Sequence, residues 1–244
     1  MAEYSIVFFI SLFIIAAMYS SVGHGGASGY LALLVIYGCS PTVMKPTALL
    51  LNVLVSLIAF IQYYRTRNFN WKIFIPLAVT SIPLAFMGGT ISLDANVYKI
   101  MLGILLIVAA FRFIFIQKGK ADQIVEANIP ALLLIGAVIG LISGMIGIGG
   151  GVILSPILLI LNWADIKQTA GISALFIFVN SIAGLGGGFI NGLQFNNAML
   201  LMLGVALIGG FVGSYVGSCL LVPNTLKKVL AVVLLIASIK LLLP

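Results

Sequence analysis

Glycine is concentrated in two short runs whose corresponding residues lie 124 positions apart: Ser21-Val-Gly-His-Gly-Gly-Ala-Ser-Gly29 and Ser143-Gly-Met-Ile-Gly-Ile-Gly-Gly-Gly151. Glycine lets other groups approach the backbone closely, but it destabilises the interior of a helix. We therefore expect each run to break a helix and to free backbone N–H groups where the next helix begins. Such helix starts favour negative charge. The two runs predict a binding site for an anion.

Polar side chains that could line the same site occur in both halves of the chain. They are His24, Ser28, Lys45, Thr47, Asn52 and Ser56, followed by Ser143, Ser155, Thr169, Ser173, Asn180 and Ser181. Carboxylates are missing from this set, because all five acidic residues fall at the ends of apolar spans or between them. A cation carrier would bring an Asp or Glu into the membrane. The set favours a small oxyanion, although a neutral solute would use similar donors.

The signatures of an enzyme or a metal site are missing. His24 has no Cys or Asp in register with it, and Cys39 and Cys219 are isolated. The run at 147–151 lacks the Lys-Ser/Thr pair of a nucleotide-binding loop. We expect no catalytic residue, no metal and no cofactor. His24 could contact substrate, carry a proton or be structural.

The composition predicts a protein embedded in a membrane. Hydrophobic residues make up 62% of the chain and charged residues 7%, with a mean hydropathy of +1.28. A soluble domain carries roughly 25% charged residues. The net charge of +7 comes from basic residues scattered between apolar segments, which argues against a nucleic-acid partner.

The apolar spans give the expected helices. They fall at about 4–38, 46–63, 72–92, 97–116, 129–161, 169–190, 197–218 and 226–243. A crossing needs roughly 20 residues, so the first and fifth are too long for one helix. We expect each to be two helical segments, broken around 23–26 and 147–151. In hydrocarbon, broken backbone is tolerated only where it is buried in protein or lines a cavity.

The two halves of the chain resemble each other. Lys45-Pro-Thr-Ala48 matches Lys167-Gln-Thr-Ala170, and Phe69-Asn70 matches Phe195-Asn196. We interpret residues 1–122 and 123–244 as two membrane repeats of about five helical segments each, within one integral membrane domain.

The basic residues favour an inverted arrangement of these repeats. If each broken span crosses once, the twelve basic residues divide 7 to 5 between the two sides. If each folds back as a re-entrant pair, they divide 9 to 3, which fits the preference for cytoplasmic Lys and Arg. This arrangement puts both termini outside the cytoplasm. Inverted repeats with interrupted helices are typical of secondary transporters.

Three motifs of the second half carry a resemblance to a known family. They are Gly144-Met-Ile-Gly-Ile-Gly-Gly-Gly151 followed by Pro156, Thr169-Ala-Gly-Ile-Ser173 with Asn180, and Gly209-Gly-Phe-Val-Gly213. The chain resembles the TauE/SafE family of sulfite and sulfonate exporters over both repeats. The resemblance implies a prokaryotic inner-membrane carrier of sulfite, sulfoacetate or another organosulfonate. The first half departs from the pattern, with His24 where the second half has Ile148.

These observations predict a secondary transporter of a small anion that works by alternating access around the two glycine runs. The expected substrate-binding residues are Gly23, His24, Gly25, Gly26, Thr47, Asn52, Gly147, Gly149, Gly150, Gly151, Thr169, Ser173 and Asn180. An anion channel and a membrane scaffold without transport are the alternatives. The partners are the substrate and the lipid bilayer. The exact substrate, the direction, a coupling H⁺ or Na⁺, and a monomeric or homodimeric state stay open.

Overall fold

The computed structural model describes residues 5–115, 124–190, 192, 197–219, 235–236 and 238–242. This part of the chain contains helices and no strand, and five of its helices are long and apolar enough to cross a membrane. The prediction of an all-helical, multi-pass membrane protein is confirmed.

The described residues of the first half form five helices. They are α1 (Ile6–Ser20), α2 (Ala27–Ile36), α3 (Pro41–Arg65), α4 (Trp71–Thr90) and α5 (Ala95–Phe115). Ser5 caps the start of α1 and Asn70 the start of α4, each by accepting a hydrogen bond from a backbone N–H group. Pro41 begins α3, where its missing N–H costs nothing.

In the described part of the second half, four helices have defined bounds. They are α6 (Ile129–Ile146), α7 (Gly151–Ile160), α8 (Ile166–Ile190) and α9 (Asn197–Cys219). Helices α2 and α7 have 10 residues each, and α3 and α8 have 25 each. Most of the last expected span, 226–243, and the landmark Phe195-Asn196 lie outside the described residues.

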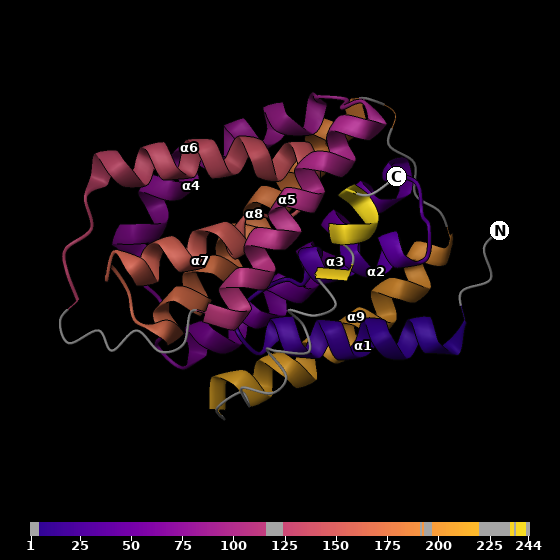
Figure 1. Cartoon of the computed structure of the whole chain (residues 1–244). Coiled ribbons are helices and arrows are strands. Elements are labelled where there is room, and N and C mark those ends of the chain that lie inside the picture. Colours follow the sequence, from indigo (N-terminus) through magenta and orange to yellow (C-terminus); the bar gives the residue numbers. More distant parts are fainter. Residues whose placement is uncertain are drawn as a thin grey trace.

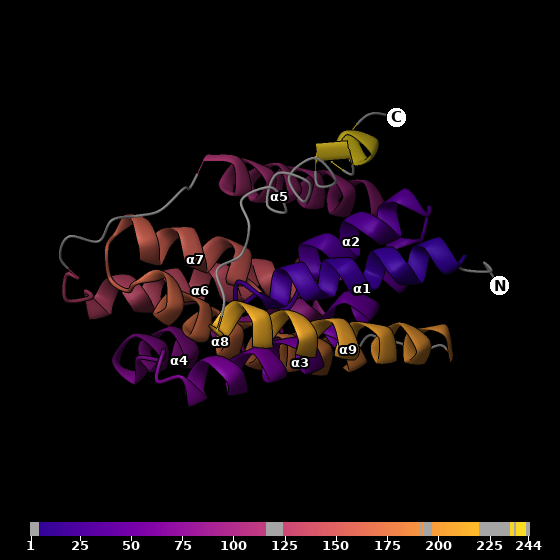
Figure 2. The same ribbon diagram turned by 90° about the horizontal axis from the view of Figure 1, so that it is seen from below.

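The helices at the two ends of the molecule pack in cross-half pairs (Figures 1 and 2). Helix α4 packs on α6, and α1 packs on α9. Glycines at every fourth position allow the backbones to approach: Gly140 of α6 lies against Ser81, and Gly213 of α9 lies against Ala17. The α4–α6 and α1–α9 contacts thereby pack the first half against the second.

Helices α3 and α8 pack against each other in the interior. Both are buried along much of their length, and the segments that link α1 to α2 and α6 to α7 reach them from opposite halves. Helix α5 lies along one side of the molecule, beside the short C-terminal segment at 238–242 (Figure 2). The central pair α3 and α8 therefore carries the side chains that the two links can meet.

The outer surface carries many large apolar side chains. Ile10 and Ile14 of α1, Ile75 and Val79 of α4, and Ile208 of α9 are among those exposed. In water such a surface would be unfavourable, whereas lipid chains are a matching solvent for it.

Candidate functional site

The two glycine-rich segments meet between α3 and α8. A methyl group added at Gly25 would lie 2.6 Å from Oδ1 of Asn52 and 2.9 Å from Cγ2 of Ile177. One added at Gly149 would lie 2.8 Å from Nδ2 of Asn52 and 2.8 Å from Cγ2 of Ile177. The same two side chains are therefore in close contact with the backbone of both segments.

Asn52 and Ile177 occupy corresponding positions in the two halves. Helices α3 and α8 begin at Pro41 and Ile166 and have equal lengths, so residue n of α3 corresponds to residue n + 125 of α8. The neighbours of the two segments agree with this register, because Gly147 lies against Lys45 and Gly23 against Ala170. The sequence match pairs Lys45 with Lys167, whereas this register pairs Lys45 with Ala170, three residues later.

Asn52 ties α3 to the second glycine segment. Its Nδ2 donates a hydrogen bond to the carbonyl of Ile148 at 3.3 Å. Its Oδ1 has no hydrogen-bond partner within the described residues, and neither has the Oγ of Ser181, which would lie 3.1 Å from a methyl group at Gly149. Both side chains are fully buried. A buried polar group without a partner is costly, so these atoms are available to a ligand.

His24 links the first glycine segment to the second half of the chain. Its Nδ1 lies 2.8 Å from the carbonyl of Val22, which can only accept, so we infer that Nδ1 carries the proton. Its Nε2 lies 3.2 Å from the carbonyl of Gly151 and 3.0 Å from the Oγ of Ser155. The neutral ring accepts at Nε2 from the Ser155 hydroxyl, whereas the protonated ring donates to Gly151.

Ser155 extends this contact to α8. Its Oγ lies 2.7 Å from the Oγ of Ser173 and 2.9 Å from the carbonyl of Gly151. Ser155, Ser173 and His24 are all buried. A continuous chain of hydrogen bonds thus runs from the first glycine segment through α7 to α8.

The starts of α2 and α7 are also part of the site. Gly26 and Gly150 precede the two helices with φ of 98° and 81°, and neither helix has a side chain that caps its first N–H groups. The Tyr30 ring packs on Gly26, and Ile139 and Phe176 pack on Gly150. Each half therefore presents a buried helix start whose dipole favours negative charge.

Gly23 and Gly147 lie earlier in their segments, nearer the ends of α1 and α6. Gly23 contacts the backbone carbonyl of Ala170 near the start of α8, and Gly147 ends α6 beside Lys45 near the start of α3. Lys45 is partly buried and its ammonium lies 3.4 Å from the carbonyl of Gly89. These two glycines position the segments on the central helices.

Three other expected site residues are buried on the central helices. The Thr47 hydroxyl donates to the carbonyl of Val43 at 2.6 Å, and one N–H of Asn180 Nδ2 donates to the carbonyl of Phe176 at 2.8 Å, so both side chains bond to their own helices. Oδ1 of Asn180 and Oγ1 of Thr169 have no partner within the described residues. Asn180 and Thr169 thus keep an acceptor that a ligand could use.

Sequence reasoning did not select Ile177, Ser155 or Ser181 as binding residues. Ser155 and Ser181 belonged to the polar set, but nothing in the sequence ranked them above the other serines. Ile177 is one of many isoleucines in an apolar span, and its position opposite Asn52 follows only from the register of α3 and α8.

The acidic and metal-ligating side chains in the described residues do not converge on this site. Asp94 and Glu126 are exposed and Asp165 is only partly buried. No cluster of His, Cys, Asp or Glu in the described ranges could hold a metal ion. An open pocket lies elsewhere, beside α5, and contains none of the residues that meet at Asn52.

The chain matches known proteins over almost its whole length. Residues 8–241 match the family model "Sulfite exporter TauE/SafE". A "Probable membrane transporter protein y4hK" from Sinorhizobium fredii is 36% identical over 237 residues, which cover 96% of each chain. A "Probable membrane transporter protein YjnA" from Bacillus subtilis is 26% identical, over 93% of this chain and 95% of its own. No solved structure matches.

Proposed function

The chain belongs to the sulfite exporter TauE/SafE family of membrane proteins, and from this premise we propose that it is a secondary transporter of a small, sulfur-containing oxyanion. Sulfite, sulfoacetate and other organosulfonates are the proposed substrates. The site is the place where the two glycine-rich segments meet Asn52 and Ile177. It lies in a prokaryotic inner membrane, within one domain made of the repeats 1–122 and 123–244.

The convergence of Gly25 and Gly149 on Asn52 is the observation that carries this proposal. It brings backbone from both halves, a carboxamide and the Ser181 hydroxyl together in one buried region. The uncapped starts of α2 and α7 add partial positive charge. Because none of the described carboxylates is buried, an anion would meet no fixed negative charge there.

His24 gives the site a group that can change its charge. When protonated, its ring donates to two carbonyl oxygens and carries one positive charge. A bound oxyanion would be attracted to that charge. His24 is therefore the proposed coupling group if the coupling ion is H⁺.

Alternating access is the proposed mechanism, with the two halves related as inverted repeats. The equal lengths of α2 and α7 and of α3 and α8 support a duplication. Helix α1 packs on α9 of the other half, and its counterpart α6 packs on α4, the counterpart of α9. This reciprocal packing supports two related halves. Rocking of one pair of helices against the other would open the site to each side in turn. Both termini then lie outside the cytoplasm.

Counterflow in proteoliposomes tests this proposal. Purified full-length protein is reconstituted with unlabelled sulfite inside, and entry of labelled sulfite from a low outside concentration is followed. A carrier exchanges the two and accumulates label transiently, whereas a channel lets the internal sulfite leave without accumulation. Sulfoacetate and butane-1-sulfonate are then tested as competitors.

Variants of the site residues connect the flux to the structure. We expect Asn52→Ala and Ser181→Ala to reduce counterflow at least tenfold. Ser214→Ala is the matched control, because Ser214 is buried on α9 and its hydroxyl bonds to its own helix. Absence of counterflow for every oxyanion tested, with monodisperse wild-type protein, would reject the transport proposal and favour a scaffold.

A further inference from the structure

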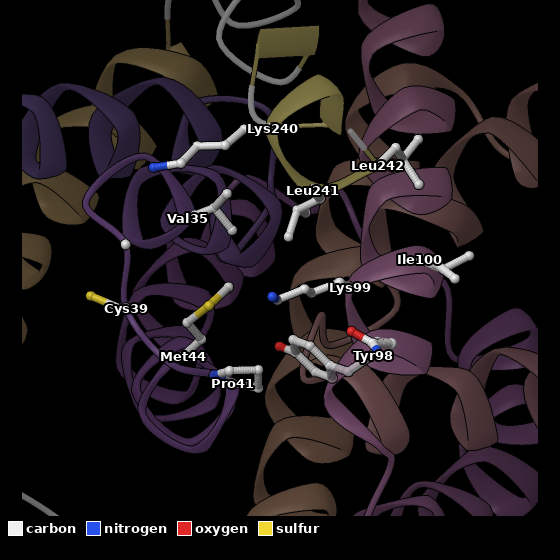
Figure 3. Close-up of a pocket in the computed structure, with 12 residues that line it drawn as sticks. Val35, Cys39, Pro41, Met44, Tyr98, Lys99, Ile100, Lys240, Leu241 and Leu242 are labelled. Atoms are coloured by element: carbon white, nitrogen blue, oxygen red, sulfur yellow. The ribbon is translucent and has the colours of Figure 1, made fainter. Parts of the chain in front are cut away.

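An open pocket lies outside the proposed central site, between the end of α2, the start of α3, the start of α5 and the C-terminal segment at 238–242 (Figure 3). Its volume is about 470 Å³. Pockets of roughly 300–1,000 Å³ typically take organic ligands. The volume therefore exceeds what a bare inorganic oxyanion would fill.

Two lysines from different halves of the chain line this pocket. The Lys99 ammonium points into it (Figure 3) and has no hydrogen bond or ion pair with another described residue. Lys240 donates to the carbonyl of Ile36, the last residue of α2, at 2.9 Å. The carboxylate of Asp94 accepts from the backbone N–H of Asn96 and does not line the pocket. The pocket thus carries net positive charge.

The remaining walls are largely apolar. Val35 and Met44 contribute from α2 and α3, and Ile100, Leu241 and Leu242 line the opposite side. Leu242 packs on Gly103 of α5, where an added methyl group would lie 2.8 Å from its Cγ. This contact and the bond from Lys240 to Ile36 hold the C-terminal segment in place as a wall.

We propose that this pocket is a second binding site, which takes an organic anion with a short apolar tail. Lys99 and Lys240 hold the anionic head, and the aliphatic side chains contact the tail. The site is independent of the central one, since it shares no residue with it, and it would hold the ligand where the half-helix α2 ends. An organosulfonate has this chemistry, and an anionic phospholipid shares its combination of an anionic head with apolar chains.

Calorimetric titration of the full-length protein in phosphatidylcholine nanodiscs tests the proposal. The probes are butane-1-sulfonate, sulfite and butylammonium. The variants are Lys99→Gln, Lys240→Gln and, as a matched control, Lys72→Gln, an exposed lysine at the start of α4 that does not line the pocket. Asn52→Ala reports on the central site in the same assay.

We expect butane-1-sulfonate to bind more tightly than sulfite and butylammonium not to bind. Loss of one hydrogen bond to a charged group weakens binding about tenfold. Lys99→Gln and Lys240→Gln should each have that effect, while Lys72→Gln keeps wild-type affinity. Loss of binding when phosphatidylglycerol is added to the nanodiscs would support the site and identify lipid as its occupant.

Two results would overturn the proposal. One is butane-1-sulfonate affinity that is unchanged in both pocket variants, or no binding at all. The other is loss of binding in Asn52→Ala alone, which would place the ligand in the central site. Transport is measured separately by counterflow. The calorimetric result for the second site can therefore be interpreted even if the transport proposal fails.

Discussion

The contact of Gly149 with Asn52 and Ile177 makes a quantitative prediction for Gly149→Ala. The added methyl group would lie 2.8 Å from Nδ2 of Asn52 and 2.8 Å from Cγ2 of Ile177. Overpacking of this kind costs about 1–3 kcal/mol. Gly149 also has a φ of 76°, and alanine in that region costs about 1–2 kcal/mol more. The substitution should therefore destabilise the folded protein by about 2–5 kcal/mol.

Two further substitutions separate the steric and backbone contributions. Gly25→Ala meets Asn52 and Ile177 at 2.6 and 2.9 Å without a positive φ, so it should cost only the overpacking, about 1–3 kcal/mol. Gly184→Ala is the control, because Gly184 lies inside α8 and its added methyl group would lie 3.5 Å from its nearest neighbours, Gly144 of α6 and Leu49 of α3. Alanine is also the better helix former, so this variant should be at least as stable as the wild type.

The assay is thermal unfolding of detergent-solubilised protein. Size-exclusion chromatography after heating measures the folded fraction at each temperature. It does not depend on the substrate. For a chain of this size a change of 1 kcal/mol shifts the midpoint by about 2–4 °C. We expect Gly149→Ala to lose at least about 4 °C, Gly25→Ala to lose less, and Gly184→Ala to lose nothing. Equal midpoints for Gly149→Ala and Gly184→Ala would refute the close packing of the two segments around Asn52.

Other substitutions test the remaining contacts. Asn52→Leu should abolish sulfite counterflow, because a leucine cannot bond the Ile148 carbonyl or a ligand; wild-type flux would remove Asn52 from the site. His24→Gln, which loses the protonated ring, should flatten the dependence of counterflow on a pH gradient; an unchanged dependence would exclude His24 as the coupling group. Gly144→Leu should prevent the α4–α6 contact, since Gly144 lies against the backbone of Ala85. It should give aggregated protein on size-exclusion chromatography, whereas Gly204→Leu, which has open space around it, should stay monodisperse.

Much of the helix layout follows from the sequence. A hydrophobic stretch of more than 30 residues exceeds one crossing, and the cost of glycine in helices suggests where it divides. The structure ends α1 at Ser20 and begins α2 at Ala27, and it ends α6 at Ile146 and begins α7 at Gly151. These boundaries lie at the two runs because glycine and its neighbours decide them locally.

The composition of the site depends on information that is not local. Thr47 and Asn180 stand out as polar residues in apolar spans, but both donate to their own helices, an arrangement that single residues do not reveal. Ile177 has no distinguishing feature in the sequence. It reaches the centre because the register of α3 and α8 places it opposite Asn52. Helix register arises from packing between the halves, so it cannot be read from sequence matches such as Lys45 with Lys167.

The unequal pair Asn52 and Ile177 has a consequence for how such a protein could arise and be rebuilt. Two identical half-chains assembled as a dimer would place either two amides or two isoleucines beside the glycine segments. Fusion of the halves into one polypeptide removes that restriction, because a mutation then changes one side alone. With the function proposed above, a tandem gene carrying the first half twice would encode a different selectivity, and co-expression of separated halves should restore transport only when both are present.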